Sequence, residues 1–203
     1  SINYLAHAYL SFNHPEILLG NMISDFVKGK KKFDYPPGIQ KGIMLHRAID
    51  TFTDIHEATK EAKEIFRPVY RLYSGAFVDV LYDHFLALDH TEFNEASLLG
   101  FSQQIYNDLG KQSQWMPENF ARMFSSMQQH NWLFNYRTRS GIQKSLGGVV
   151  RRSVYLTESD IAFQLFEKNY QLLQGCYRHF WTDLKPFAFQ QFKFLQNEAS
   201  DSI

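Results

Sequence analysis

Apolar residues recur every three to four positions along nearly the whole chain, which is the spacing of one face of an α-helix. Few segments alternate apolar and polar residues as a strand does, and no Asn-Gly or Asp-Gly pair marks a hairpin turn. The pattern therefore predicts an all-α fold. We expect helices over residues 2–12, 15–27, 38–57, 58–73, 76–88, 92–109, 118–136, 140–149, 157–176 and 177–198.

Prolines and glycines indicate where these helices begin and end. Pro15 and Pro117 suit the first turn of a helix, where proline removes no helical hydrogen bond. Gly29 opens a loop that carries a run of lysines. Thr157 and Asp160 have the Thr-x-x-acid spacing of a helix cap, and Pro186 predicts a kink in the last helix.

The composition adds a core to these helices. The chain has 203 residues, of which 44% are hydrophobic and 16% aromatic, so it is long and apolar enough to bury a continuous core. We expect residues 1–203 to form a single domain, a helical bundle.

Charge gives no overall direction to a partner. The 21 basic and 21 acidic residues cancel, so no global field attracts nucleic acid or a membrane. A charged partner would have to be bound by a local patch. Two basic segments are candidates, although each could also be a solvated turn: Lys28, Lys30, Lys31 and Lys32, and the pair Arg151 and Arg152.

Cysteine usage and hydropathy indicate a reducing compartment. The single Cys176 excludes an internal disulfide and a cysteine-based zinc cluster. No apolar run approaches the roughly 20 residues that cross a bilayer, and the first residues lack the pattern of a signal peptide. We therefore expect a cytoplasmic protein without a membrane partner.

Polar residues embedded in apolar helices are the candidates for chemistry. His46 and Asp50 lie four residues apart and so share one face of their predicted helix. Ile43 lies beside that face, which indicates that the face is covered. A covered carboxylate needs a cation, either Arg47 or a metal ion. A solvated flank is the other interpretation.

Three further segments repeat the pattern. Asp83 and His84 interrupt one apolar helix, and a core histidine bonded to a backbone carbonyl is the alternative reading of His84. His7 interrupts another, where a satisfied core histidine is the usual outcome. Asp25 ends a third, and a local pair with Lys28 would explain it. If these polar faces met, they would form a metal site in a helical bundle and support metal-assisted hydrolysis.

Common catalytic motifs are missing from the sequence. It contains no phosphate-binding loop of the Gly-x4-Gly-Lys-Ser/Thr kind, no Gly-x-Ser-x-Gly elbow and no dinucleotide fingerprint. This argues against kinases, common serine hydrolases and NAD enzymes.

Four ordered blocks resemble the bacterial acyl carrier protein phosphodiesterases. They are residues 3–10 (NYLAHAYL), 20–29 (GNMISDFVKG), 42–50 (GIMLHRAID) and 82–86 (YDHFL), and weaker similarity continues through residues 132–137 to the C-terminal helices. The resemblance implies an all-helical fold distantly related to the HD phosphohydrolases. HD phosphohydrolases carry a His-Asp dipeptide that is absent from this sequence. In its place the chain offers His46 with Asp50, and Asp83 with His84 in reversed order.

The reaction that the resemblance implies is hydrolysis of the phosphodiester between a carrier-protein serine and 4'-phosphopantetheine. The products are apo-acyl carrier protein and free phosphopantetheine. A divalent metal ion suits this chemistry, because it neutralises the phosphodiester and lowers the pKa of bound water. Mixed carboxylate and imidazole ligands favour Mn²⁺, with Mg²⁺ as the other candidate.

The site residues are predicted on the same basis. Asp25, His46, Asp50 and Asp83 are the expected metal ligands. His7 is expected to be a fifth ligand or the acid that protonates the serine oxygen, with His84 as the alternative acid. Arg47 could hold the phosphate with two hydrogen bonds. Carrier proteins are acidic, so the four lysines are the first candidate dock and the two arginines the second.

Two rival functions remain open at this stage. The first is a metal-dependent phosphohydrolase of nucleotides or other small phosphoesters. The second is a non-enzymatic helical module that binds an acidic protein through its basic loop.

Overall fold

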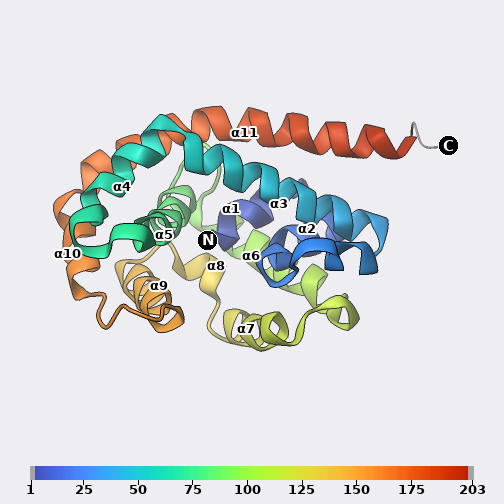
Figure 1. Ribbon diagram of the computed structural model, residues 1–203, viewed down its shortest axis with the longest axis horizontal. Helices are drawn as coiled ribbons and strands as arrows, with labels where there is room; N and C mark the ends of the chain where they lie inside the picture. The colour runs from blue at the N-terminus through green and yellow to red at the C-terminus, as the bar shows by residue number, and fades with distance from the viewer. Residues whose placement is uncertain (1–2, 201–203) are drawn as a thin grey trace.

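Helices fill the described chain, as the spacing of apolar residues predicts. The computed structural model describes residues 3–200, and that range contains no strand (Figure 1). The α-helices are α1 (Tyr4–Tyr9), α2 (Pro15–Ile23), α3 (Pro37–Ile55), α4 (Glu57–Tyr70), α5 (Ser74–Ala87), α6 (Glu95–Gly110), α7 (Glu118–Gln129), α8 (Trp132–Asn135), α9 (Arg139–Arg152), α10 (Asp160–Lys168) and α11 (Tyr170–Ser200). Short 3-10 helices follow α2 (η1, Ser24–Phe26; η2, Gly29–Asp34), α4 (η3, Arg71–Tyr73) and α6 (η4, Ser113–Trp115).

Helices α1, α2 and α5 contribute most of their residues to the buried interior. Most residues of α1 and α5 are buried, because these helices are apolar on nearly every side. The long α11 crosses one side of the molecule beside α3 and α4, while α7 and α9 lie on the opposite side (Figure 1). Buried hydrophobic residues from Tyr4 to Phe192 form one continuous cluster.

Two glycines let α2 and α3 touch through their backbones. A Cβ on Gly20 would overlap the carbonyl oxygen of Ile39, and a Cβ on Gly42 would overlap the carbonyl oxygen of Ile17. Glycine is therefore required where the two helices cross. The crossing sets the backbone of Asn21 against the α3 turn that carries His46.

Several predicted boundaries were wrong. The helix expected over 118–136 splits into α7 and α8, because Asn131 adopts a left-handed conformation with φ 48°. The last junction falls at Asn169 rather than at 176, and α11 runs on through Pro186. Ser159 is the N-cap residue of α10 in place of Thr157, and the first predicted helix ends at Tyr9. Ile2, where that helix was expected to begin, lies outside the described residues.

The basic loop is more ordered than expected. Lys30, Lys31 and Lys32 lie in the 3-10 helix η2.

None of the described helices combines the length and the apolar character that crossing a bilayer requires.

Candidate metal centre

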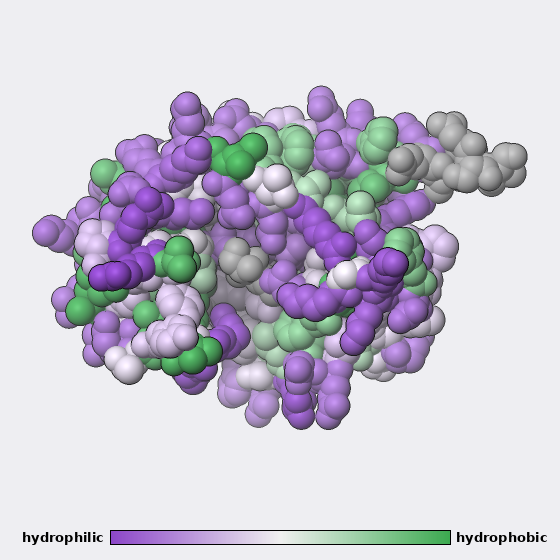
Figure 2. Space-filling view, in the orientation of Figure 1, coloured by the Kyte–Doolittle hydropathy of each residue, from purple (hydrophilic) through white to green (hydrophobic). Residues whose placement is uncertain are grey.

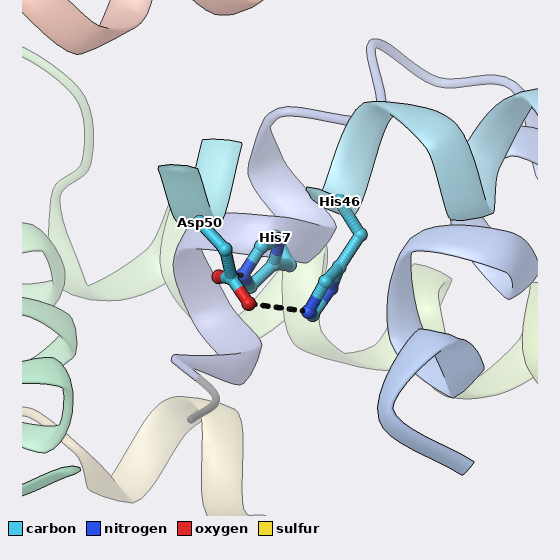
Figure 3. Close-up of side chains that lie close together, drawn as sticks. All are labelled: His7, His46 and Asp50. Atoms are coloured by element: carbon cyan, nitrogen blue, oxygen red, sulfur yellow. Dashed lines mark ion pairs between the residues drawn. The ribbon is translucent and has the colours of Figure 1, made fainter. Parts of the chain in front are cut away.

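Helices α1 and α3 bring two buried histidines face to face. The rings of His7 and His46 stack with centroids 3.9 Å apart and planes 13° from parallel (Figure 3). Asp50 reaches both of them: its Oδ2 lies 3.1 Å from His46 Nε2, and its Oδ1 lies 3.4 Å from His7 Nε2. The predicted pairing of His46 and Asp50 on one helical face is thus present, and His7 joins it from another helix.

Asn21 fixes the orientation of both rings. His7 Nδ1 lies 2.6 Å from Asn21 Oδ1, and His46 Nδ1 lies 2.7 Å from the backbone carbonyl of Asn21. An amide or carbonyl oxygen accepts, so each ring donates from Nδ1 and its neutral form keeps a lone pair on Nε2. Carbonyl partners of this kind orient metal-binding histidines in proteins.

Asn21 is a site residue that was not predicted from the sequence. The signal was its position: Asn21 is a polar residue in an apolar helical segment, four residues before Asp25. In the structure its side chain also donates to the carbonyl of His7 and to Ser11 Oγ. Asn21 therefore connects α2 to α1 and α3 at the site.

Asp25 completes the cluster from η1. Its Oδ1 lies 3.3 Å from His46 Nε2. The side chains of Asp25 and Asp50 are 32% and 29% exposed, whereas those of His7 and His46 are 0% and 1% exposed. The two carboxylates therefore form the open side of the cluster and the imidazoles its buried wall.

The charges of the cluster are strongly coupled. Burial lowers the pKa of His46, but Asp25 and Asp50 outweigh burial and raise that pKa to about 9. Burial and the neighbouring His46 lower the pKa of His7. Burial raises the pKa of Asp50, yet contacts with His46 and His7 lower it overall. The site thus favours positive charge between its two carboxylates.

A divalent cation fits this arrangement. The Nε2 atoms of His7 and His46 are buried and lack a partner with hydrogen-bond geometry among the described residues, although carboxylate oxygens lie nearby. Lone pairs and carboxylates that face one another repel unless a proton or a metal ion lies between them. His7, His46 and Asp50 form a candidate metal-binding group, since one ligand atom from each lies within 4.8 Å of the others. Imidazole and carboxylate are the donors that transition-metal ions accept.

A second group, His56, His179 and Asp183, meets the same distance criterion but fits a metal less well. His56 Nδ1 accepts the backbone N–H of Ala58 at the start of α4. The ring proton therefore lies on Nε2, which donates to Asp183 Oδ2 at 2.8 Å. His56 acts as a helix cap and offers no free lone pair.

Asp83 and His84 lie elsewhere. Both carboxylate oxygens of Asp83 accept backbone N–H groups at the start of α1, from Leu5 and Ala6, each at 2.9 Å. His84 Nδ1 donates to the carbonyl of Tyr136 at 2.7 Å, and its Nε2 lies 3.0 Å from the Tyr170 hydroxyl. Burial lowers the pKa of His84 to about 4. The structure thus places Asp83 at the start of α1 as a cap and His84 in the core, bonded to a backbone carbonyl. Neither residue joins the group of His7, His46 and Asp50.

The predicted basic residues lie on three different segments of the chain. Arg47 donates to the carbonyl of Val27 at 3.1 Å, just after the helix that carries Asp25. Lys28, Lys30 and Lys31 are exposed. Arg151 and Arg152 are also exposed and end α9. In Figure 1, α9 lies to the left of α1, whereas α2 lies to its right.

Several known proteins with similar sequences share the name acyl carrier protein phosphodiesterase. A family model described as acyl carrier protein phosphodiesterase matches residues 2–184. A protein of that name from Yersinia pestis is 33% identical over 181 residues, which are 89% of this chain and 94% of the relative. One from Klebsiella pneumoniae (strain 342) is 30% identical over 188 residues, 92% of this chain and 97% of the relative. No solved structure matches the chain, so the relation to HD phosphohydrolases stays a prediction. With a family match over most of its length, this chain belongs to the acyl carrier protein phosphodiesterase family.

Proposed function

We propose that this protein hydrolyses the phosphodiester between 4'-phosphopantetheine and the serine of holo-acyl carrier protein. The family and the names of its relatives support this reaction. The single structural observation that carries the proposal is the cluster of His7, His46 and Asp50, in which imidazole lone pairs and carboxylate oxygens converge at a half-open site.

Four residues would hold the cation: His7, His46, Asp25 and Asp50. Mn²⁺ suits two imidazoles and two carboxylates better than Ca²⁺ does, and Mg²⁺ is the other candidate. Bound there, a divalent ion would neutralise charge on the phosphodiester and make water a stronger nucleophile. We leave Asp83 out of this ligand set because the start of α1 occupies both of its oxygens.

The residues of the chain divide the remaining work. Asn21 and its backbone carbonyl hold the two imidazoles in the tautomer that presents Nε2. His7 is buried and its pKa is lowered, so at neutral pH it lacks the proton that an acid catalyst needs and serves as a ligand. Asp25 and Asp50 are partly exposed, so a cation that they held would be open to a substrate phosphate at the mouth of the site.

The basic residues would guide the carrier protein. An acidic carrier attaches to a protein of zero net charge through local basic patches. The exposed Lys28, Lys30 and Lys31, with Lys32 beside them, follow directly after η1 and its Asp25. Arg47 lies close enough to the same segment to hold an incoming phosphate, because its guanidinium already reaches Val27.

The test is to weigh holo-carrier by mass spectrometry after incubation with the protein and either Mn²⁺ or chelator. We expect the carrier to lose its prosthetic group when the protein is incubated with Mn²⁺, and to keep it when chelator replaces Mn²⁺. His46→Ala and Asp50→Ala should leave the carrier intact in both cases. His179→Ala is the matched control, since it removes a histidine from the other cluster and should leave the rate unchanged. Full activity of both cluster variants would refute the site. Hydrolysis of free nucleotides with intact holo-carrier would refute the substrate.

A further inference from the structure

A cavity of about 650 Å³ lies between α7, α8 and α9, outside the cluster described above. Its lining includes Tyr4, Trp132, Ser145 and the cations Lys144, Arg151 and Arg152. Its volume falls within the range of about 300–1,000 Å³ that is usual for pockets that bind small molecules. Figure 2 shows this face of the molecule hollowed near its centre.

Tyr4 connects the cavity to the metal-binding cluster. It lies on α1, three residues before His7, so the two side chains leave the same side of that helix. Tyr4 also belongs to the lining of the cavity, as does Arg152. The lining of the cavity therefore includes a residue one helical turn away from His7. A ligand that extends from the cluster past Tyr4 would enter the cavity.

The lining is chemically mixed. The lining combines aromatic rings such as Trp132 with hydroxyl and amide side chains, among them Ser126, Asn135 and Ser140. Within the described chain, Lys144, Arg151 and Arg152 form no ion pair, so their charges are available to an anion. Such a lining suits a flexible polar ligand with amide groups, a hydroxyl and one anionic end.

We propose that this cavity receives the pantetheine arm of the substrate while its phosphate lies at the cluster, an inference that rests on the proposed function. The amides and hydroxyl of the arm would bond to the polar side chains of α8 and α9, and its dimethyl-bearing carbon would pack on Trp132. Arg152, which lines the cavity as Tyr4 does, would attract the phosphate end.

Filling the cavity tests the proposal without altering the cluster. Ser145→Phe places a ring in the cavity from the half-buried face of α9, and Ser140→Phe does so from an exposed position at the start of the same helix. Gln143→Phe is the matched control, because Gln143 is exposed on α9 and does not line the cavity. Using both filling variants guards against one of them failing to fold.

Three readouts separate the possible results. For a filling variant we expect KM for holo-carrier to rise, and affinity for free pantetheine measured by NMR titration to fall, each by about tenfold. Mn²⁺ affinity and hydrolysis of bis(p-nitrophenyl) phosphate should match those of Gln143→Phe. Unchanged KM and pantetheine affinity in both filling variants would overturn the proposal. Pantetheine binding in the cavity of a protein that leaves holo-carrier intact would support the cavity assignment and refute the proposed function.

Discussion

Replacing Asn21 with alanine breaks three hydrogen bonds at the centre of the site. The Asn21 side chain accepts from His7 Nδ1 and donates to the His7 carbonyl and to Ser11 Oγ. Because Asn21 is fully buried, water does not replace these bonds. A buried polar group left without a partner costs about 1–3 kcal/mol. We expect the free energy of unfolding to fall by about 3 kcal/mol, which includes the small cavity left behind.

The same substitution should weaken metal binding. Without the acceptor oxygen of Asn21, the ring of His7 loses the bond that places its lone pair on Nε2 toward Asp50. Loss of such an orienting partner typically costs about 10- to 100-fold in metal affinity. His46 keeps its own partner, since that partner is the backbone carbonyl of Asn21. We therefore expect weakened rather than abolished binding.

Electron paramagnetic resonance of free Mn²⁺ measures this affinity, and urea unfolding measures stability. Ser11→Ala is the control, because it removes one acceptor of Asn21 but leaves the bond between Asn21 and His7 Nδ1. It should keep Mn²⁺ affinity within about threefold of the wild type. If Asn21→Ala bound Mn²⁺ as tightly as the wild type, the assigned role of Asn21 would be refuted.

Three further outcomes can be measured. Mn²⁺ at about 100 times its dissociation constant should stabilise the protein by about 2.7 kcal/mol in thermal unfolding, and an equal gain in His46→Ala would contradict the assigned site. Asp83→Asn should lower the free energy of unfolding in urea by about 1–3 kcal/mol, since one backbone N–H of α1 loses its acceptor. The variant should keep its affinity for Mn²⁺. Unchanged stability together with weakened Mn²⁺ binding would make Asp83 a ligand. The pKa of His84 is about 4 when folded and 6.5 in its ordinary state, so the unfolded chain takes up the proton first as pH falls from 6.5 to 4. The neutral His84 therefore contributes its full stabilisation above pH 6.5, and the free energy of unfolding falls by up to about 3 kcal/mol by pH 4. In urea titrations at several pH values, His84→Gln should reduce this fall. An unchanged dependence of the unfolding free energy on pH would contradict the role of His84.

The helical fold and half of the site could be predicted from residue spacing. His46 and Asp50 are four residues apart on one helix, so their proximity follows from helix geometry alone. Helix ends were less predictable, because Asn131 turns left-handed at a position without glycine or proline. The contact between His7 and Asp50 depends on how α1 packs on α3, which local periodicity does not contain.

Asp83 shows why the remaining site residues could not be assigned from the sequence. Like Asp50, it is an acidic residue within an apolar helix. What distinguishes the two is the group opposite each: a pair of imidazoles for Asp50, and the first backbone N–H groups of α1 for Asp83. Every residue except proline has the same backbone N–H group. The sequence therefore contains no particular side chain that would reveal Asp83 as the acceptor for the start of α1.

The crossing of α2 and α3 at Gly20 and Gly42 has a consequence for comparing sequences. The backbone oxygen that orients His46 belongs to Asn21, the neighbour of Gly20, so a larger residue at either glycine would push that oxygen away from the ring. A homologue that keeps both histidines but carries a bulky residue at the crossing would thus hold them at a different spacing. The glycine pair is therefore a useful diagnostic, alongside the ligands themselves, for recognising which distant sequences retain this centre.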